Sequence, residues 1–224
     1  MSRLDQVYTN SVNGETLTFN AMEFHNSSLN MGAIGNYSGP YTLSILFRRD
    51  QFDTWTRQDL TEIMFSTTST NQNLSFGFNK SWPTNYWFHA DANSYIYGLH
   101  VPSGRTMNDF MSYYNGGASP SASYPGTNPN GWVHVMFVFD GSTLKIIANG
   151  VTVTTENTST VRSTGSGNWY IGGYGNGSSS NQLSYWHSQG QRSPTELGPI
   201  FFADKALTYD EVWAELKAQE MYNA

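Results

Sequence analysis

Apolar residues that recur at every second position are the main structural signal along this chain. In residues 41–47 the apolar side chains are Tyr41, Leu43, Ile45 and Phe47, with polar residues between the first three. This period of two predicts a half-buried strand with one face toward a core. The same kind of pattern predicts further strands around residues 15–25, 61–66, 73–78, 85–90, 94–101, 168–174 and 198–204.

Residues 132–155 carry the clearest strand pattern of the sequence. Three apolar runs are separated by Asp140-Gly141 and by Asn149-Gly150. Asn-Gly favours a two-residue type I′ turn because both turn positions need a positive φ. The segment therefore predicts an antiparallel meander with a tight second hairpin. Inward-facing rows are expected from Trp132, Val135, Phe137 and Phe139.

A helix is predicted only near the C-terminus. Thr208 and Glu211 have the spacing of a capping box, in which each side chain bonds the backbone N–H of the other residue. The apolar residues that follow at helical spacing are Tyr209, Val212, Trp213 and Leu216. This stripe should pack the helix onto the sheets.

The elements together predict an all-β fold: a two-sheet antiparallel jelly-roll sandwich with one short C-terminal helix. Two polar segments rich in Gly, Ser and Asn, residues 112–131 and 175–193, read as loops. Strand patterns continue on both sides of each loop without a change in composition, so we expect residues 1–224 to form a single domain.

The composition of the chain argues against several classes of function. Charged residues make up only 12% of the chain, and the net charge is −6 without a cluster of Lys and Arg. Such a surface argues against nucleic acid as the main partner, because nucleic-acid binding neutralises phosphates. The absence of cysteine excludes disulfides and thiolate zinc sites. No long apolar run is present, so membrane insertion is not expected, and without the apolar region of a signal peptide we expect a soluble cytosolic product.

Several motifs in order resemble a known superfamily. The core of the pattern, residues 131–150, reads GWVHV, then FDGSTLK, then NG. Weaker matches are LTFNAMEF at 17–24, the strand at 41–47, WYIGG at 169–173 and the segment 198–212 that contains ALTYDEV. Together they resemble laminin-G-like jelly rolls of the concanavalin A-like lectin and glucanase superfamily. The resemblance implies the sandwich fold and leaves the ligand open, because this superfamily includes lectins, adhesins and glycosidases.

Catalytic constellations are missing from the sequence. Glycosidases need two carboxylates on one face, and the nearest candidate here is the lone Glu62. No nucleophile elbow or phosphate-binding glycine loop occurs. Among the histidines, His89 and Asp91 share one strand face and could bind a metal together or form a surface pair. We therefore expect a protein that is not an enzyme.

Calcium is the metal that laminin-G-like folds usually hold, through oxygen ligands. The residues that stand in the corresponding opening motif are Asn20 and Glu23, with Ala21 in place of its glycine. Asp204 is the only further nameable ligand. These three residues are weak candidates, and no cofactor is otherwise expected.

Aromatic residues in polar surroundings are the remaining functional signal. Rings stack on the apolar C–H faces of sugars while Asn, Ser and backbone groups bind the hydroxyls. The candidate carbohydrate-binding residues are Trp82, Trp87, Tyr174, Tyr185 and Trp186. The alternative is structural: strand aromatics are favoured to fill the sandwich, and the two rings of the 175–193 loop could anchor that loop.

Three functions are compatible with these features. The first is a non-catalytic structural or adhesion module of a bacteriophage virion, in a capsid or tail, that binds surface glycans or other virion proteins. The second is an extracellular carbohydrate-binding module or adhesin of a bacterium. The third is a glycosidase with an unrecognised site. Homo-oligomerisation is left open.

Overall fold

The computed structural model describes residues 2–24, 29–35, 37, 39–49, 61–66, 75–79, 86–89, 96–98, 132–157, 167–172 and 195–223. For residues 61–98 the description is limited to the backbone and its pairing. The first strands are β1 (Ser2–Thr9), β2 (Thr16–Phe24), β3 (Leu29–Gly32), β4 (Tyr41–Arg49), β5 (Thr61–Ser66), β6 (Ser75–Asn79), β7 (Tyr86–His89) and β8 (Ile96–Gly98). They are followed by β9 (Trp132–Phe139), β10 (Thr143–Ala148), β11 (Val151–Asn157), β12 (Trp169–Ile171), β13 (Thr195–Ala203) and the helix α2 (Tyr209–Asn223).

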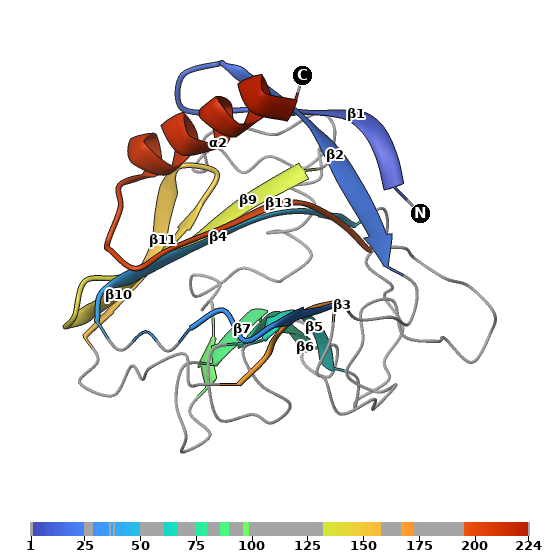
Figure 1. Ribbon diagram of the computed structural model, residues 1–224. Helices are drawn as coiled ribbons and strands as arrows, with labels where there is room; N and C mark the ends of the chain where they lie inside the picture. The colour runs from blue at the N-terminus through green and yellow to red at the C-terminus, as the bar shows by residue number, and fades with distance from the viewer. Residues whose placement is uncertain are drawn as a thin grey trace.

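The strands form two antiparallel sheets, as the sequence predicts. One sheet has seven strands in the order β1-β2-β13-β4-β9-β10-β11, and the other has six in the order β3-β12-β5-β6-β7-β8. Figure 1 shows the two sheets face to face, with α2 on the far side of the seven-stranded sheet. The all-β sandwich with a C-terminal helix is therefore confirmed.

The β9–β10–β11 meander is also confirmed. Ala148 pairs with Val151 across a two-residue turn, in which Asn149 has a φ of 47° and Gly150 a φ of 83°. Both values lie in the left-handed region that a type I′ turn requires. The local chemistry of Asn-Gly was sufficient to fix this hairpin.

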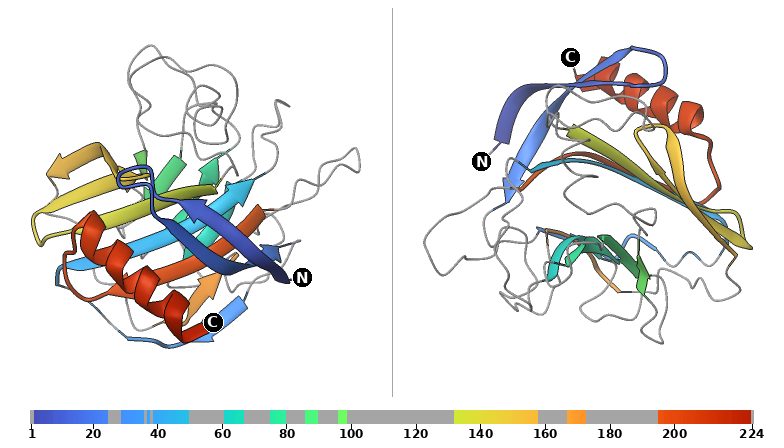
Figure 2. Two further views of the ribbon diagram at one scale, coloured as in Figure 1. Left: turned by 90° about the horizontal axis from the view of Figure 1, so that it is seen from above. Right: turned by 180° about the vertical axis from the view of Figure 1, so that it is seen from behind.

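The prediction of a half-buried strand at 41–47 is wrong, because β4 is buried on both faces. Leu43 and Phe47 are 0% exposed, and so is Ser44 on the opposite face. The second face is covered by α2 and by the β1–β2 hairpin, which curls over the sheet (Figure 2). Strand β9 is buried throughout as well.

The four residues of β9 that were predicted to face inward lie on two different faces, because the strand is buried on both. Trp132 joins Met136 and Val138 in the core beneath α2. Alternation along the strand puts Val135, Phe137 and Phe139 on the other face, toward the six-stranded sheet. The ring of Phe139 accordingly lies 5.6 Å from that of Tyr41. Trp132 therefore does not share a face with the other three residues, and the protein has two cores.

Helix α2 begins as predicted. The backbone N–H of Thr208 donates to Glu211 Oε2 at 2.7 Å, and the backbone N–H of Glu211 donates to Thr208 Oγ1 at 3.2 Å. The Thr208 hydroxyl also donates to Glu211 Oε2, at 2.8 Å, and together with the Thr208 N–H it lowers the pKa of Glu211 below its usual range. The predicted stripe is buried, with Val212, Trp213 and Leu216 at most 4% exposed.

Strands β1 and β3 were not expected from the sequence. Each lies at the edge of its sheet, and β3 has exposed residues at Leu29 and Met31. An edge strand with few buried residues lacks the alternation on which the prediction depends. Among the described residues, no helix has the length and apolar character needed to cross a membrane.

A bulge in β13 allows the β1–β2 hairpin to leave the sheet. The register of β13 against β4 shifts between Leu197 and Ile200, where the sequence is Gly198-Pro199. A Cβ on Gly198 would lie 2.6 Å from the ring of Phe19, so glycine is needed for this close approach. In the described part of the chain β2 pairs with β13 only at Met22, Glu23 and Phe24, and its earlier residues bend toward α2.

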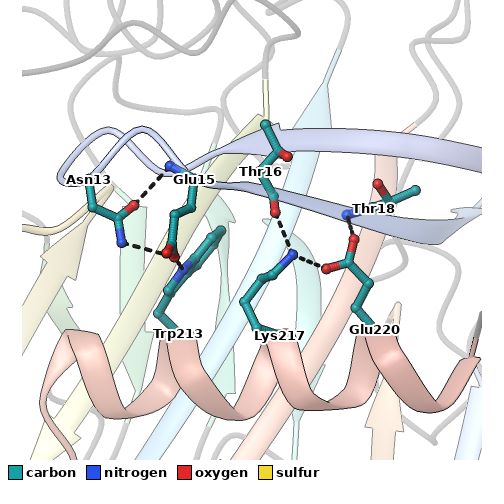
Figure 3. A network of polar contacts seen from close by, with 7 residues as sticks. All are labelled: Asn13, Glu15, Thr16, Thr18, Trp213, Lys217 and Glu220. Carbon is teal, nitrogen blue, oxygen red and sulfur yellow. Dashed lines mark hydrogen bonds and ion pairs between the residues drawn. The ribbon is translucent and has the colours of Figure 1, made fainter.

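Side chains of α2 occupy the free edge of β2 (Figure 3). Lys217 Nζ donates to the backbone carbonyl of Thr16 at 2.7 Å, and the backbone N–H of Thr18 donates to Glu220 Oε1 at 2.7 Å. Lys217 and Glu220 also form an ion pair with each other. Partial burial opposes ionisation of Glu220, but Lys217 and Thr18 outweigh it and lower its pKa. The helix thus supplies the hydrogen bonds that a neighbouring strand would otherwise make.

Candidate functional site

A serine and a histidine meet in the core beneath α2. Ser44 Oγ lies 2.7 Å from His134 Nε2, which is within hydrogen-bond distance for a nucleophile and its base. Both residues are 0% exposed, and burial lowers the pKa of His134 to about 3. A neutral imidazole without access to a substrate has a structural role.

Asn149 connects this buried pair to the N-terminal hairpin. Its Oδ1 accepts hydrogen bonds from Tyr8 Oη at 3.0 Å and from the backbone N–H of His134 at 2.9 Å. Its backbone carbonyl accepts from Ser11 Oγ at 2.6 Å. Tyr209 packs on His134 with ring centroids 5.3 Å apart, and burial raises the pKa of this tyrosine to about 12. The cluster holds the hairpin, the turn and the helix together.

The weak calcium candidates are spread along the sheet. Glu23 on β2 pairs in register with Glu196 on β13, whereas Asp204 follows the opposite end of β13. At about 3.3 Å per residue, roughly 25 Å of strand separate Glu23 from Asp204. Asn20 is exposed on β2. Over the part of the chain that the structure describes, no group of three or more acidic or histidine residues could hold a metal ion.

The structure describes one of the five carbohydrate-binding candidates. Trp87 lies on β7 of the six-stranded sheet. Trp82, Tyr174, Tyr185 and Trp186 lie outside the described residues. Glu62 is near the start of β5, in register with Phe78. For this part of the candidate site, the structure gives the register in which the strands of the six-stranded sheet pair.

Two neighbouring rows of residues cross all six strands and differ sharply in chemistry. One row is entirely apolar or aromatic and contains Leu29, Ile171, Phe65, Phe76, Phe88 and Tyr97. The adjacent row is mainly polar and contains Asn30, Tyr170, Ser66, Ser75, His89 and Ile96. Adjacent rows lie on opposite faces of a sheet, because side chains alternate along each strand.

Trp169 identifies the face that the apolar row occupies. It is 3% exposed, and its ring lies 4.7 Å from that of Phe202 on β13 of the opposing sheet. Ile171, two residues further along β12, is on the same face. Trp169 and Ile171 therefore face the seven-stranded sheet, and Tyr170 faces away from it; the residues of β5 to β8 are placed in these rows by their register alone.

Trp87 stands two residues before His89 on β7 and therefore has the same place in the alternation. Its partners in register are Gly77 on β6 and Gly98 on β8. The tryptophan position is thus flanked on both neighbouring strands by residues without side chains. The sequence analysis named Trp87 together with four other rings and did not separate it from them. The alternation in Phe-Gly-Phe at 76–78 and in Trp-Phe-His at 87–89 was a signal that it left unused.

Comparisons with known proteins bear on the fold. No protein-family model matches the sequence, and no curated protein does either. Among solved structures, the binding domain of Paraclostridial Mosquitocidal Protein 1 matches with a TM-score of 0.58 and 12% identity. The receptor-binding domain of botulinum neurotoxin D matches with a TM-score of 0.56 and 11% identity, and the binding domain of serotype G with 0.55 and 9%.

Each match covers 98% of this chain and 46 to 48% of the toxin domain. The chain thus spans about half the length of the domains it resembles. At these identities the likeness defines the class of fold, which is the β-sandwich also found in these clostridial binding domains. The finer resemblance to laminin-G-like and concanavalin A-like proteins stays a prediction.

Proposed function

We propose that this protein is a non-catalytic binding module that attaches to glycans on a cell surface. The observation that carries the proposal is the sandwich itself, which over 98% of the chain follows domains described as binding or receptor-binding domains. The buried Ser44–His134 pair adds support, because it is closed to substrates.

The ligand class is inferred from composition. Aromatic residues make up 15% of the chain and charged residues only 12%. This balance suits sugars, which stack on rings and bind neutral hydrogen-bonding groups, better than it suits phosphate-rich or highly charged partners. From the sequence, Tyr185 and Trp186 are the candidate rings in the 175–193 loop.

A glycan array with the full chain tests this proposal. Binding to one or more surface glycans is expected, and the absence of any binding would contradict it. In that case attachment to other proteins, such as those of a virion shell, becomes the alternative. Addition of EDTA is expected to leave binding unchanged, since Glu23 on β2 lies beside the start of β13 whereas Asp204 follows its end.

The double variant Tyr185→Ala/Trp186→Ala separates ligand contact from loop anchoring. If the rings stack on sugar, binding weakens while the melting temperature barely moves. If they anchor the loop, the melting temperature falls. Display on a virion or on a bacterial cell surface is proposed from the sequence and would be tested by fractionation of the source.

A further inference from the structure

We propose that the core beneath α2 binds at least one internal water molecule between Asn10, Asn149 and Tyr209. Asn10 lies in the turn between β1 and β2, Asn149 in the turn between β10 and β11, and Tyr209 is the first residue of α2. Tyr8 Oη lies 3.0 Å from Asn149 Oδ1 and 3.4 Å from Tyr209 Oη. Tyr209 Oη in turn donates to Asn10 Oδ1 at 3.3 Å. The proposed site therefore joins three segments that are far apart in the sequence.

Backbone donors fix the orientation of both asparagine amides. Asn10 Oδ1 accepts the backbone N–H of Val12 at 2.9 Å. Asn149 Oδ1 accepts the backbone N–H of His134, also at 2.9 Å. Because a backbone N–H can only donate, neither amide can be turned to exchange its oxygen and its nitrogen. Both Nδ2 atoms are therefore donors, and in the part of the chain that the structure describes these buried atoms have no acceptor.

A third buried nitrogen belongs to the same cluster. His134 Nδ1 also has no hydrogen-bond partner among the described residues. Asn10 and His134 are 0% exposed, and Asn149 is 1% exposed. A buried polar group without a partner loses its bonds to solvent on folding and gains none in return, so native proteins pair nearly all such groups. Three of them in one hydrogen-bonded cluster indicate a partner that the chain itself does not supply.

The donors and acceptors of the cluster favour water over an ion. The two amide nitrogens offer N–H groups, whereas Tyr209 gives its single hydroxyl proton to Asn10 and can only accept from a further partner. A water molecule donates and accepts, and internal waters typically make about three hydrogen bonds. A chloride ion could accept from the amides but would face the lone pairs of the tyrosine oxygen. A cation would instead meet the amide hydrogens.

Magnetisation transfer between water and the side-chain amides tests the site in the full chain. The measurement uses NMR on 15N-labelled protein under slightly acidic conditions, where amide protons exchange slowly with solvent. The Nδ2 protons of Asn10 or Asn149 should show the sign of a long-lived water contact. Asn20, which is exposed on β2, is the matched control and should show only the sign of short-lived surface contacts. Surface-like transfer at both buried asparagines would overturn the proposal.

A high-resolution crystal structure from sodium bromide solution distinguishes water from an anion. Density is expected within about 2.7–3.2 Å of the Nδ2 atom of Asn10 or Asn149, without the anomalous signal of bromide. A bromide signal at this place would overturn the proposal in favour of an anion site. Protein acceptors bonded to both Nδ2 atoms would overturn it as well, because the cluster would then be complete without water. Glycan binding is independent of all these outcomes, so the proposed function is tested separately.

Discussion

The two sheets of this protein differ in how their faces are covered. The central strands of the seven-stranded sheet are buried on both sides, so that even Ser44 and His134 are 0% exposed. The six-stranded sheet instead has an apolar row of residues beside a mainly polar row, which is the pattern of a sheet with one buried face. A polar residue of the seven-stranded sheet can therefore have a structural role because of the layers that cover it.

The largest expected difference concerns one large apolar side chain from each sheet. Trp132→Ala in β9 should lower the free energy of unfolding by about 3–5 kcal/mol, because it leaves a cavity beneath α2 where the side chain is 0% exposed. Met31→Ala in β3 of the other sheet, where the side chain is 47% exposed, should lower it by less than about 1 kcal/mol. Urea unfolding of both variants measures the contrast. Equal losses would mean that the two positions are equally buried.

Two asparagines give the next contrast. Asn149→Ala should cost about 2–3 kcal/mol, because it leaves the Tyr8 hydroxyl and the His134 N–H without their buried acceptor. Asn30→Ala in the six-stranded sheet removes an exposed bond to the N–H of Gly32 and should cost less than about 1 kcal/mol. Asn149→Gly separates the causes, since glycine tolerates the positive φ and lacks the acceptor. If Asn149→Gly is as stable as the unaltered chain, the acceptor contributes nothing.

The pH dependence of stability tests whether His134 is shielded from water in the core under α2. Burial lowers the pKa of His134 to about 3, whereas an unfolded histidine has a pKa of about 6.5. Above pH 6.5 the imidazole is neutral in both states. Below it only the unfolded chain binds a proton, so stability should fall by up to about 1.4 kcal/mol per pH unit down to about pH 3.

A comparison of variants separates the contribution of His134 to the pH dependence of stability from that of the carboxylates. Urea midpoints between pH 7.5 and 4.5 should depend less on pH in His134→Gln than in the unaltered chain. His89→Gln in β7 of the other sheet is the matched control and should retain the full dependence. A His134→Gln variant with an unchanged slope would show that this histidine is protonated when folded.

The smallest effect is expected at the helix that covers the seven-stranded sheet. Thr208→Ala should cost about 1 kcal/mol, because it removes the side-chain oxygen that accepts the N–H of Glu211. Thr208→Ser retains the oxygen and is the control. Thermal unfolding measures both, and equal melting temperatures for the two variants would exclude a contribution from the cap.

Short-range patterns explain what the sequence by itself determined. The turn at Asn149-Gly150, the cap at Thr208 and the alternation in β4 each depend on residues within a few positions of one another, and all three are present. The same patterns missed two edge strands: β3, whose residues are mostly exposed, and β1, which contributes Tyr8 to the core beneath α2. They also predicted too little burial for β4, since the residues that cover its second face come from the two ends of the chain.

Only the tertiary structure decided which face each row of residues occupies. Alternation separates Trp87 from Phe88 in the sequence, but the inner row is identified by Trp169 packing on Phe202 of the other sheet. The spread of Glu23 and Asp204 along β13 likewise depends on strand pairing. Register and layer arise from contacts between residues far apart in the chain, which no local pattern encodes.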